Sequence, residues 1–182
     1  MTNEATRKPR VITPVQPSAS AAAAQSEVRT APANEVLITR LINAPREMVF
    51  DAWLSHEHLA NWFGPEGFTI TTRSIDVRTG GEWHFTMHGP DGVDYINHVF
   101  YTEVKRPERI AYRHTGGGDT EAIRFETEVT FVDVGGNTEL SLRSIFPSAE
   151  ERDFVVANYG AIEGGKQTIG RLAAYLDQLQ HA

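Results

Sequence analysis

The sequence predicts an α+β domain in which one antiparallel sheet packs against a long C-terminal helix. Three features support this class: an early strand-like run followed by two short helical patterns, six further strand-like runs in succession, and a long final segment with apolar residues at helical spacing. Consecutive strands joined by short turns pair antiparallel. Because such a sheet must bury its apolar face, the last helix is the element long enough to cover it.

The first strand and two short helices are predicted from residue 35 onward. β-branched and apolar residues fill residues 35–42, and Pro45 is typical of the first turn of a helix. Apolar residues then recur at helical spacing as far as Trp53, and Ser55 is suited to cap a second short helix. The Gly64-Pro65-Glu66-Gly67 cluster ends that helix.

Six strands follow, with Gly, Pro, Asn or Asp at each boundary between them. They are predicted over residues 68–77, 82–88, 93–104, 109–114, 122–132 and 138–146. The Gly89-Pro90-Asp91-Gly92 turn predicts a hairpin with a three-residue loop, in which His88 pairs with Asp94 and Trp83 pairs with Val99.

This register predicts one aromatic face on the hairpin. The side chains that share the face are Trp83, Phe85, Met87, Tyr95, Asn97, Val99 and Tyr101. The strand over residues 122–132 alternates in the same way: Ile123, Phe125, Thr127, Val129 and Phe131 face one side, and polar residues face the other. The sheet is therefore expected to have one apolar face and one wet face.

The C-terminal segment predicts a long amphipathic helix that is interrupted near its start. Ser148 begins a capping-box pattern, and apolar residues recur at helical intervals as far as Leu179. Four glycines each cost roughly 1 kcal/mol relative to Ala inside a helix, namely Gly160, Gly164, Gly165 and Gly170, and three of them lie between residues 160 and 165. We expect a kink or two helical segments there.

The composition places limits on domain organisation and partners. Residues 1–34 hold eight Ala and four Pro but no aromatic residue, so they are expected to form a flexible tail before a single domain over residues 35–182. The net charge of −7 argues against nucleic-acid binding. The absence of cysteine fits a cytoplasmic protein, and no apolar stretch reaches the roughly 18 residues of a membrane span.

The order of several short motifs resembles the activator of heat-shock protein 90 ATPase-like family, within the START-like (SRPBCC) superfamily of helix-grip domains. The resemblance covers residues 35–179. The motifs that carry it are Ala44-Pro45, Val49-Phe50, Ala52-Trp53, Trp62-Phe63-Gly64-Pro65, Gly80-Gly81, Gly89-Pro90-Asp91-Gly92, Pro107-Glu108-Arg109-Ile110, Glu163-Gly164-Gly165-Lys166-Gln167-Thr168 and Arg171-Leu172. Many members carry Trp where this chain has Gly165.

The resemblance implies a curved sheet that grips the C-terminal helix, in the order β-α-α-β6-α, with a cavity between them for an apolar small molecule. Plain core packing is the alternative explanation for each aromatic residue taken singly. As a group with Asn97, which could orient a ligand, they predict an apolar binding site. The candidate lining residues are Trp53, Trp62, Phe63, Trp83, Phe85, Met87, Tyr95, Asn97, Tyr101, Phe125 and Tyr159.

Other clusters of functional side chains give weaker predictions. His84, His88 and His98 share a face and could bind a metal, but that face is the wet one, so solvated histidines are the simpler interpretation. Residues 160–166 match a phosphate-binding loop up to Lys166, yet Gln167 replaces the required Ser or Thr. No serine lies in a nucleophile elbow. No catalytic residue, metal or cofactor is therefore predicted.

Three functions stay open. The preferred one is binding of an apolar or aromatic small molecule without covalent chemistry. The second is a protein-binding module that docks on a heat-shock protein 90 chaperone and stimulates its ATPase, which only the family resemblance supports. The third is a hydrolase or cyclase that uses the cavity, for which carboxylates near strand ends, namely Asp76, Glu82 and Glu103, are the available acids. The sequence leaves the oligomeric state undetermined.

Overall fold

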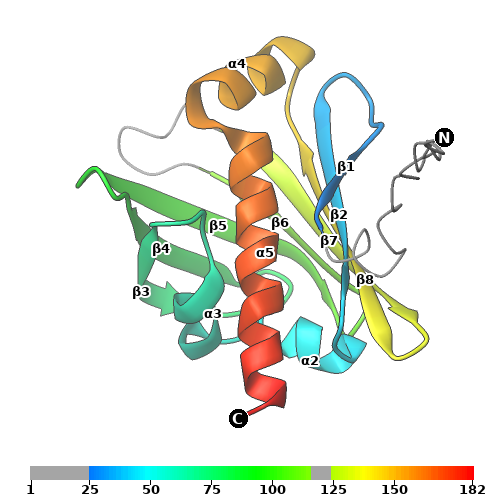
Figure 1. The fold of residues 1–182 in the computed structure, drawn as a ribbon. Helices are drawn as coiled ribbons and strands as arrows, with labels where there is room; N and C mark the ends of the chain where they lie inside the picture. The colour runs from blue at the N-terminus through cyan, green and yellow to red at the C-terminus, as the bar shows by residue number, and fades with distance from the viewer. Residues whose placement is uncertain (1–24, 116–123) are drawn as a thin grey trace, which may run out of the picture.

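The computed structural model describes residues 25–115 and 124–182 (Figure 1). Its strands are β1 (Glu27–Arg29), β2 (Glu35–Ile42), β3 (Thr69–Ile75), β4 (Glu82–His88), β5 (Asp94–Lys105), β6 (Arg109–His114), β7 (Phe125–Val134) and β8 (Asn137–Ile145). Its helices are α2 (Arg46–Asp51), α3 (His56–Trp62), α4 (Ala149–Tyr159) and α5 (Ala161–Gln180).

The strands form one antiparallel sheet in the order β1-β2-β8-β7-β6-β5-β4-β3. The early strand β2 pairs with the last strand β8, so the sheet brings the two ends of the domain together. Figure 1 shows α5 crossing one face of the sheet, with α2 and α3 near the C-terminal end of α5 and α4 near its N-terminal end. This arrangement confirms the predicted α+β class with a curved sheet against a long C-terminal helix.

The predicted hairpin register is confirmed. His88 pairs with Asp94 and Trp83 pairs with Val99 across β4 and β5. Gly92 takes a positive φ of 83° in the turn, as a three-residue loop requires. This register places the predicted aromatic side chains on one face of the hairpin.

The predicted helix ends are also confirmed. The Ser55 hydroxyl accepts a hydrogen bond from the His58 amide at 3.3 Å, and the Ser148 hydroxyl accepts one from the Glu151 amide at 3.1 Å. Gly160 adopts a left-handed conformation between α4 and α5. The C-terminal helical region is accordingly two segments that meet at this glycine.

Strand β1 was not predicted, because residues 27–29 were expected to belong to a tail. Their exposed side chains give no hydrophobic pattern, but their backbone pairs with β2 along the edge of the sheet. Residues 1–24 lie outside the described residues, as do residues 122 and 123 of the predicted strand over 122–132. The described part of that strand begins at Phe125 and runs on to Val134.

The core consists of two clusters of buried side chains. The larger one joins α2, α3 and the C-terminal half of α5 to the sheet, and it includes Trp53, Trp62 and Leu172. The smaller one, which includes Val36 and Phe146, lies where β2 and α4 meet. In the part of the chain that the structure describes, no helix is long and apolar enough to cross a membrane.

Candidate ligand cavity

A cavity of about 440 Å³ lies between the sheet and the N-terminal half of α5. Its walls come from β2, from β4 to β8, from the loop after α3, and from α4 and the start of α5. Apolar and aromatic side chains make up most of this lining, and the polar side chains among them are Asn97, Thr127, Ser144, Asn158 and Thr168, together with His114 and three tyrosines. Cavities of roughly 300–1,000 Å³ with such linings are typical of small-molecule sites.

The residues of α5 explain where the cavity lies. In the C-terminal half, Ile169, Leu172 and Leu176 are buried against the sheet and fill the space beneath the helix. In the N-terminal half, Gly164 and Gly165 face the cavity and contribute no side chain to it. The helix therefore fills one end of the space that it covers and leaves the other end hollow.

Gly165 also lets the helix approach the sheet closely. A Cβ atom built at this position would lie 2.6 Å from Ile38 Cδ1, which is closer than real Cβ atoms come. The position next to the Gly165 backbone is thus occupied by Ile38, a residue that itself lines the cavity. The interpretation that a missing side chain simply leaves empty space is incomplete here, because part of that space is taken by Ile38.

The structure brings eight of the eleven predicted lining residues to the cavity wall. They are Trp53, Phe63, Phe85, Met87, Tyr95, Asn97, Phe125 and Tyr159. Phe63 packs edge-on against Phe85, with ring centroids 5.6 Å apart, so the loop after α3 and the hairpin share one aromatic wall.

The other three, Trp62, Trp83 and Tyr101, lie in the packed core and do not line the cavity. Trp62 is fully buried, and its indole N–H donates to the Ala52 carbonyl at 3.1 Å. Trp83 and Tyr101 lie at the end of the hairpin away from its turn. Alternation identifies the face of a strand on which a residue lies, but it does not identify which level along that face borders a cavity.

Polar groups in the lining are partly committed to the protein itself. The Asn97 carboxamide donates to the Tyr95 carbonyl at 2.9 Å, and the Thr168 hydroxyl donates to the Gly164 carbonyl at 2.8 Å. Within the described residues the Ser144 hydroxyl makes no side-chain hydrogen bond. Burial raises the pKa of the Tyr112 phenol above its ordinary value, so this group stays neutral.

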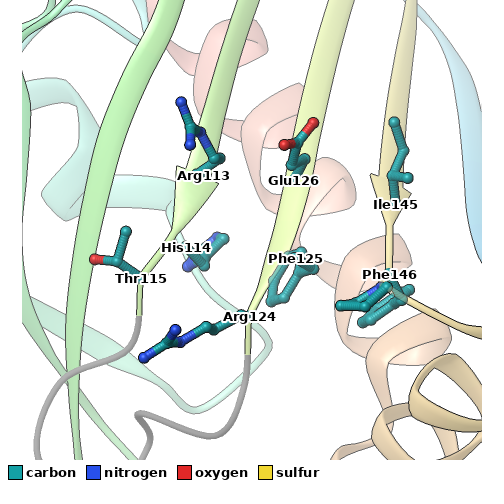
Figure 2. Close-up of a pocket in the computed structure, with 9 residues that line it drawn as sticks. Arg113, His114, Thr115, Arg124, Phe125, Glu126, Ile145 and Phe146 are labelled. Carbon is teal, nitrogen blue, oxygen red and sulfur yellow. The ribbon is translucent and has the colours of Figure 1, made fainter.

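Sequence reasoning missed His114, which lies at the wall between this cavity and an open neighbouring pocket of about 610 Å³. Figure 2 shows its ring beside Phe125 and Phe146; His114 lies on β6, Phe125 on β7, and Phe146 directly after β8. His114 stacks on Phe125 with centroids 4.2 Å apart, and Phe125 stacks on Phe146 at 5.1 Å. Burial lowers the pKa of His114 to about 4, so the imidazole is neutral at pH 7.

His114 pairs directly with Phe125 across β6 and β7, so the register of these two strands would have placed it beside Phe125. The side of the strand that Phe125 occupies was predicted, but the register of β6 was not.

The ionisable side chains among the described residues that line the cavity are His114 and three tyrosines. Among the described residues that line it there is no Asp, Glu, Lys or Arg. The carboxylates considered from the sequence lie elsewhere: Asp76 pairs with Arg78, and Glu103 pairs with Arg109. The arrangement can hold an uncharged molecule by shape and burial, and polar side chains such as Asn97 and Ser144 could orient it.

The architecture is that of the START-like helix-grip class. The chain belongs to the family of activator of Hsp90 ATPase homolog 1-like proteins, whose family model matches residues 43–177. No curated protein matches the chain significantly.

Solved structures share the fold at low sequence identity. A crystal structure of a protein from Nitrosomonas europaea is 20% identical with a TM-score of 0.74, and the match covers 84% of this chain and 100% of that one. A solution structure of a protein from Arthrobacter aurescens is 22% identical with a TM-score of 0.76, covering 84% of this chain and 91% of that one. A crystal structure of a protein from Mycobacterium smegmatis is 24% identical with a TM-score of 0.73, covering 82% and 95%.

Proposed function

We propose that the protein binds an uncharged small molecule carrying an aromatic or other apolar group in the cavity beneath the N-terminal half of α5. The observation that carries this proposal is the cavity of about 440 Å³ with a largely apolar and aromatic lining. A binding site of this kind gains affinity from the apolar area that it removes from water. The proposal keeps the function preferred from the sequence, which is binding of an apolar or aromatic small molecule without covalent chemistry.

The composition of the lining favours an uncharged ligand. A charged group brought into a wall without Asp, Glu, Lys or Arg would lose its hydration and gain no ion pair. A neutral hydroxyl or carbonyl on the ligand could instead exchange hydrogen bonds with Ser144 and Asn97. The proposed ligand is therefore apolar over most of its surface, with at most a few neutral polar atoms.

The test uses N-phenyl-1-naphthylamine, an uncharged aromatic dye whose fluorescence rises in apolar surroundings. We expect one dye molecule to bind per chain in a fluorescence titration, with a matching rise in the melting temperature. A Gly165→Leu variant should weaken dye binding at least tenfold, because the new side chain enters the cavity beside Ile38 and Leu142.

Gly170→Leu is the matched control, since Gly170 lies on the same helix but outside the cavity. It should bind the dye as tightly as the unaltered chain. Equal binding by Gly165→Leu and the unaltered chain would overturn the proposal, as would a dye signal that never saturates.

A further inference from the structure

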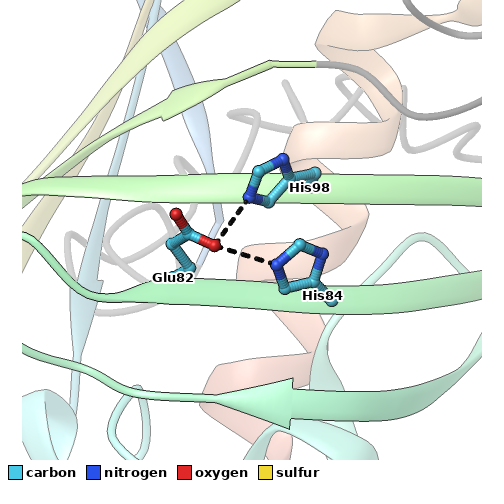
Figure 3. Close-up of side chains that lie close together, drawn as sticks. All are labelled: Glu82, His84 and His98. Atoms are coloured by element: carbon cyan, nitrogen blue, oxygen red, sulfur yellow. Dashed lines mark hydrogen bonds and ion pairs between the residues drawn. The ribbon is translucent and has the colours of Figure 1, made fainter.

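The outer face of the β4–β5 hairpin carries a compact cluster of Glu82, His84 and His98 (Figure 3). Glu82 and His84 are two residues apart on β4, so they share a face, and His98 lies directly opposite His84 on β5. Their face is opposite to the one on which Phe85 lines the cavity. The cluster is therefore independent of the proposed ligand site.

The cluster differs from the one that the sequence suggests. His88 lies on the same face but is held by other groups: its Nδ1 lies 2.7 Å from Asp94 Oδ1, and its Nε2 lies 2.8 Å from the Thr71 hydroxyl. Glu82 is the third member of the cluster. The sequence analysis considered Glu82 only as one of several carboxylates near strand ends.

The potential ligand atoms lie close together, on one carboxylate and two imidazole rings that stack with centroids 4.0 Å apart. Glu82 Oε2 lies 3.0 Å from His84 Nε2 and 3.2 Å from His98 Nε2, and all three atoms lie within 4.8 Å of one another. Bond lengths of 2.0–2.1 Å at a tetrahedral zinc ion separate neighbouring ligand atoms by about 3.3 Å. The separations of 3.0 and 3.2 Å are close to the one that the ion would impose.

Thr115 orients the His98 ring for this role. Its hydroxyl lies 2.9 Å from His98 Nδ1 and 3.3 Å from the His98 carbonyl oxygen. When Nδ1–H donates to the hydroxyl and the hydroxyl donates to the carbonyl, the lone pair of the neutral ring is on Nε2, which faces Glu82. A hydrogen bond at the second ring nitrogen is the usual support for a metal-binding histidine.

Charge and access also favour a cation. Glu82 contributes a carboxylate oxygen, a ligand that divalent cations accept in proteins. The side chains of His84, Glu82 and His98 are 38%, 49% and 30% exposed, which gives an ion a path from solvent. Two imidazoles with one carboxylate suit Zn²⁺ and its transition-metal neighbours better than Mg²⁺ or Ca²⁺.

We propose that Glu82, His84 and His98 bind one divalent transition-metal ion, with Zn²⁺ as the best fit, and that the ion joins β4 to β5 on the outer face of the sheet. Water completes its coordination. Since the ion binds the folded hairpin and bridges two strands, it stabilises the native state.

The test is isothermal titration of the full chain, free of any histidine tag and cleared of metal with a chelator, with ZnCl₂ at pH 7.5. We expect one Zn²⁺ per chain and a rise in melting temperature that MgCl₂ at the same concentration does not produce. His84→Ala, His98→Ala and Glu82→Gln should each weaken Zn²⁺ binding at least tenfold.

His88→Ala is the matched control on the same strand and face, and it should bind Zn²⁺ as the unaltered chain does. Circular dichroism of each variant without metal checks that it folds. Unchanged Zn²⁺ affinity in both His84→Ala and His98→Ala would overturn the proposal, and so would the absence of one-to-one binding. Dye binding in the cavity is expected to stay the same in all these variants, so this test and that of the proposed function fail separately.

The positioning role of Thr115 has its own readout. Thr115→Val should weaken Zn²⁺ binding about 10–100-fold, the range typical of lost support to a ligand histidine. Thr115→Ser keeps the hydroxyl and should restore the affinity. Equal affinities in the two variants would show that the hydroxyl does not position His98.

Discussion

The two ends of the space beneath α5 differ in how they are filled, although one helix covers both. At the C-terminal end, Leu172 and Leu176 interlock with Trp53, Trp62 and other side chains of the larger core cluster. At the N-terminal end, Gly164, Gly165 and Ala161 present little side chain, and a cavity of about 440 Å³ remains. One helix therefore has two roles: its C-terminal half packs in the core, and its N-terminal half borders a cavity that could hold a ligand.

The boundary between these ends runs through Trp53. Its ring packs edge-on against Trp62 at 4.8 Å in the core, and Trp53 also lines the cavity. Its indole nitrogen is buried and finds no hydrogen-bond partner among the described residues. Trp53 therefore belongs to both ends, because it packs in the core and also lines the cavity.

The largest expected contrast comes from the same substitution at the two ends. Leu172→Ala should lower the free energy of unfolding by about 3–5 kcal/mol, because it opens a cavity in a closely packed core. Leu142→Ala, at the wall of the existing cavity, should cost about 2 kcal/mol or less, because that side chain already borders open space. Urea denaturation measures both values, and equal losses would mean that the two ends are packed alike.

The pH dependence of stability in a His114 variant tests whether water reaches the His114 ring at the cavity wall. The folded pKa of His114 is about 4 and the unfolded value is about 6.5, so the unfolded chain binds more protons between these values. The stability that the neutral ring provides is thus present above pH 6.5 and is lost as the pH falls toward 4. It amounts to about 3 kcal/mol.

His114→Gln should remove this part of the pH dependence, which the difference between the two urea-denaturation curves isolates from other titrating groups. His181→Gln, which changes an exposed histidine near the C-terminal end, is the matched control. An unaltered slope in His114→Gln would mean that water reaches the ring in the folded state.

Arg171 connects α5 to the loop after α3, which lines the cavity. Its Nη1 lies 2.9 Å from the carbonyl oxygens of Gly64 and Pro65 and 3.1 Å from that of Phe68. Arg171→Met should cost about 2 kcal/mol and speed amide hydrogen exchange in residues 64–68. Arg78→Met, which removes an exposed ion pair, should change stability by less than about 0.5 kcal/mol and leave that exchange unaltered.

The smallest expected effect compares two glycines of α5. Gly170→Ala should raise stability by about 0.5–1 kcal/mol, since the nearest atom to the new Cβ is Arg40 Nη1 at 3.7 Å. Gly165→Ala should gain less, because Ile38 Cδ1 must move out of the way. Thermal denaturation measures the difference in stability between the two variants. Equal gains would mean that Ile38 moves aside without loss of free energy.

Most of the fold could be predicted from local signals. The turn at Gly89-Pro90-Asp91-Gly92 fixed the register of its hairpin, and Ser55 and Ser148 marked helix starts, because such signals act within a few residues. Strand β1 could not be predicted, since it depends on backbone pairing with β2 and not on its own side chains.

The site was less predictable than the fold. Alternation predicted the face of the strand on which each residue lies, but not its position along that face. Phe85 and Asn97 line the cavity, whereas Trp83 and Tyr101 lie in the packed core. The position along the face depends on which turn of α5 lies over each strand, a long-range property that no local pattern encodes. His114 was missed for another reason, because the register of β6 against β7 was not predicted.

Strand β1 has a consequence for how the molecule meets other molecules. Its three residues occupy hydrogen-bonding groups along the outer side of β2, and Arg29 Nε donates to the Thr39 hydroxyl at 3.0 Å to hold it there. A chain shortened to begin at Glu35 would bare that side of β2, where Val36 and Ile38 alternate with other residues. Exposed ladder groups of this kind recruit strands from neighbouring copies, so these few residues act as a guard against edge-to-edge aggregation.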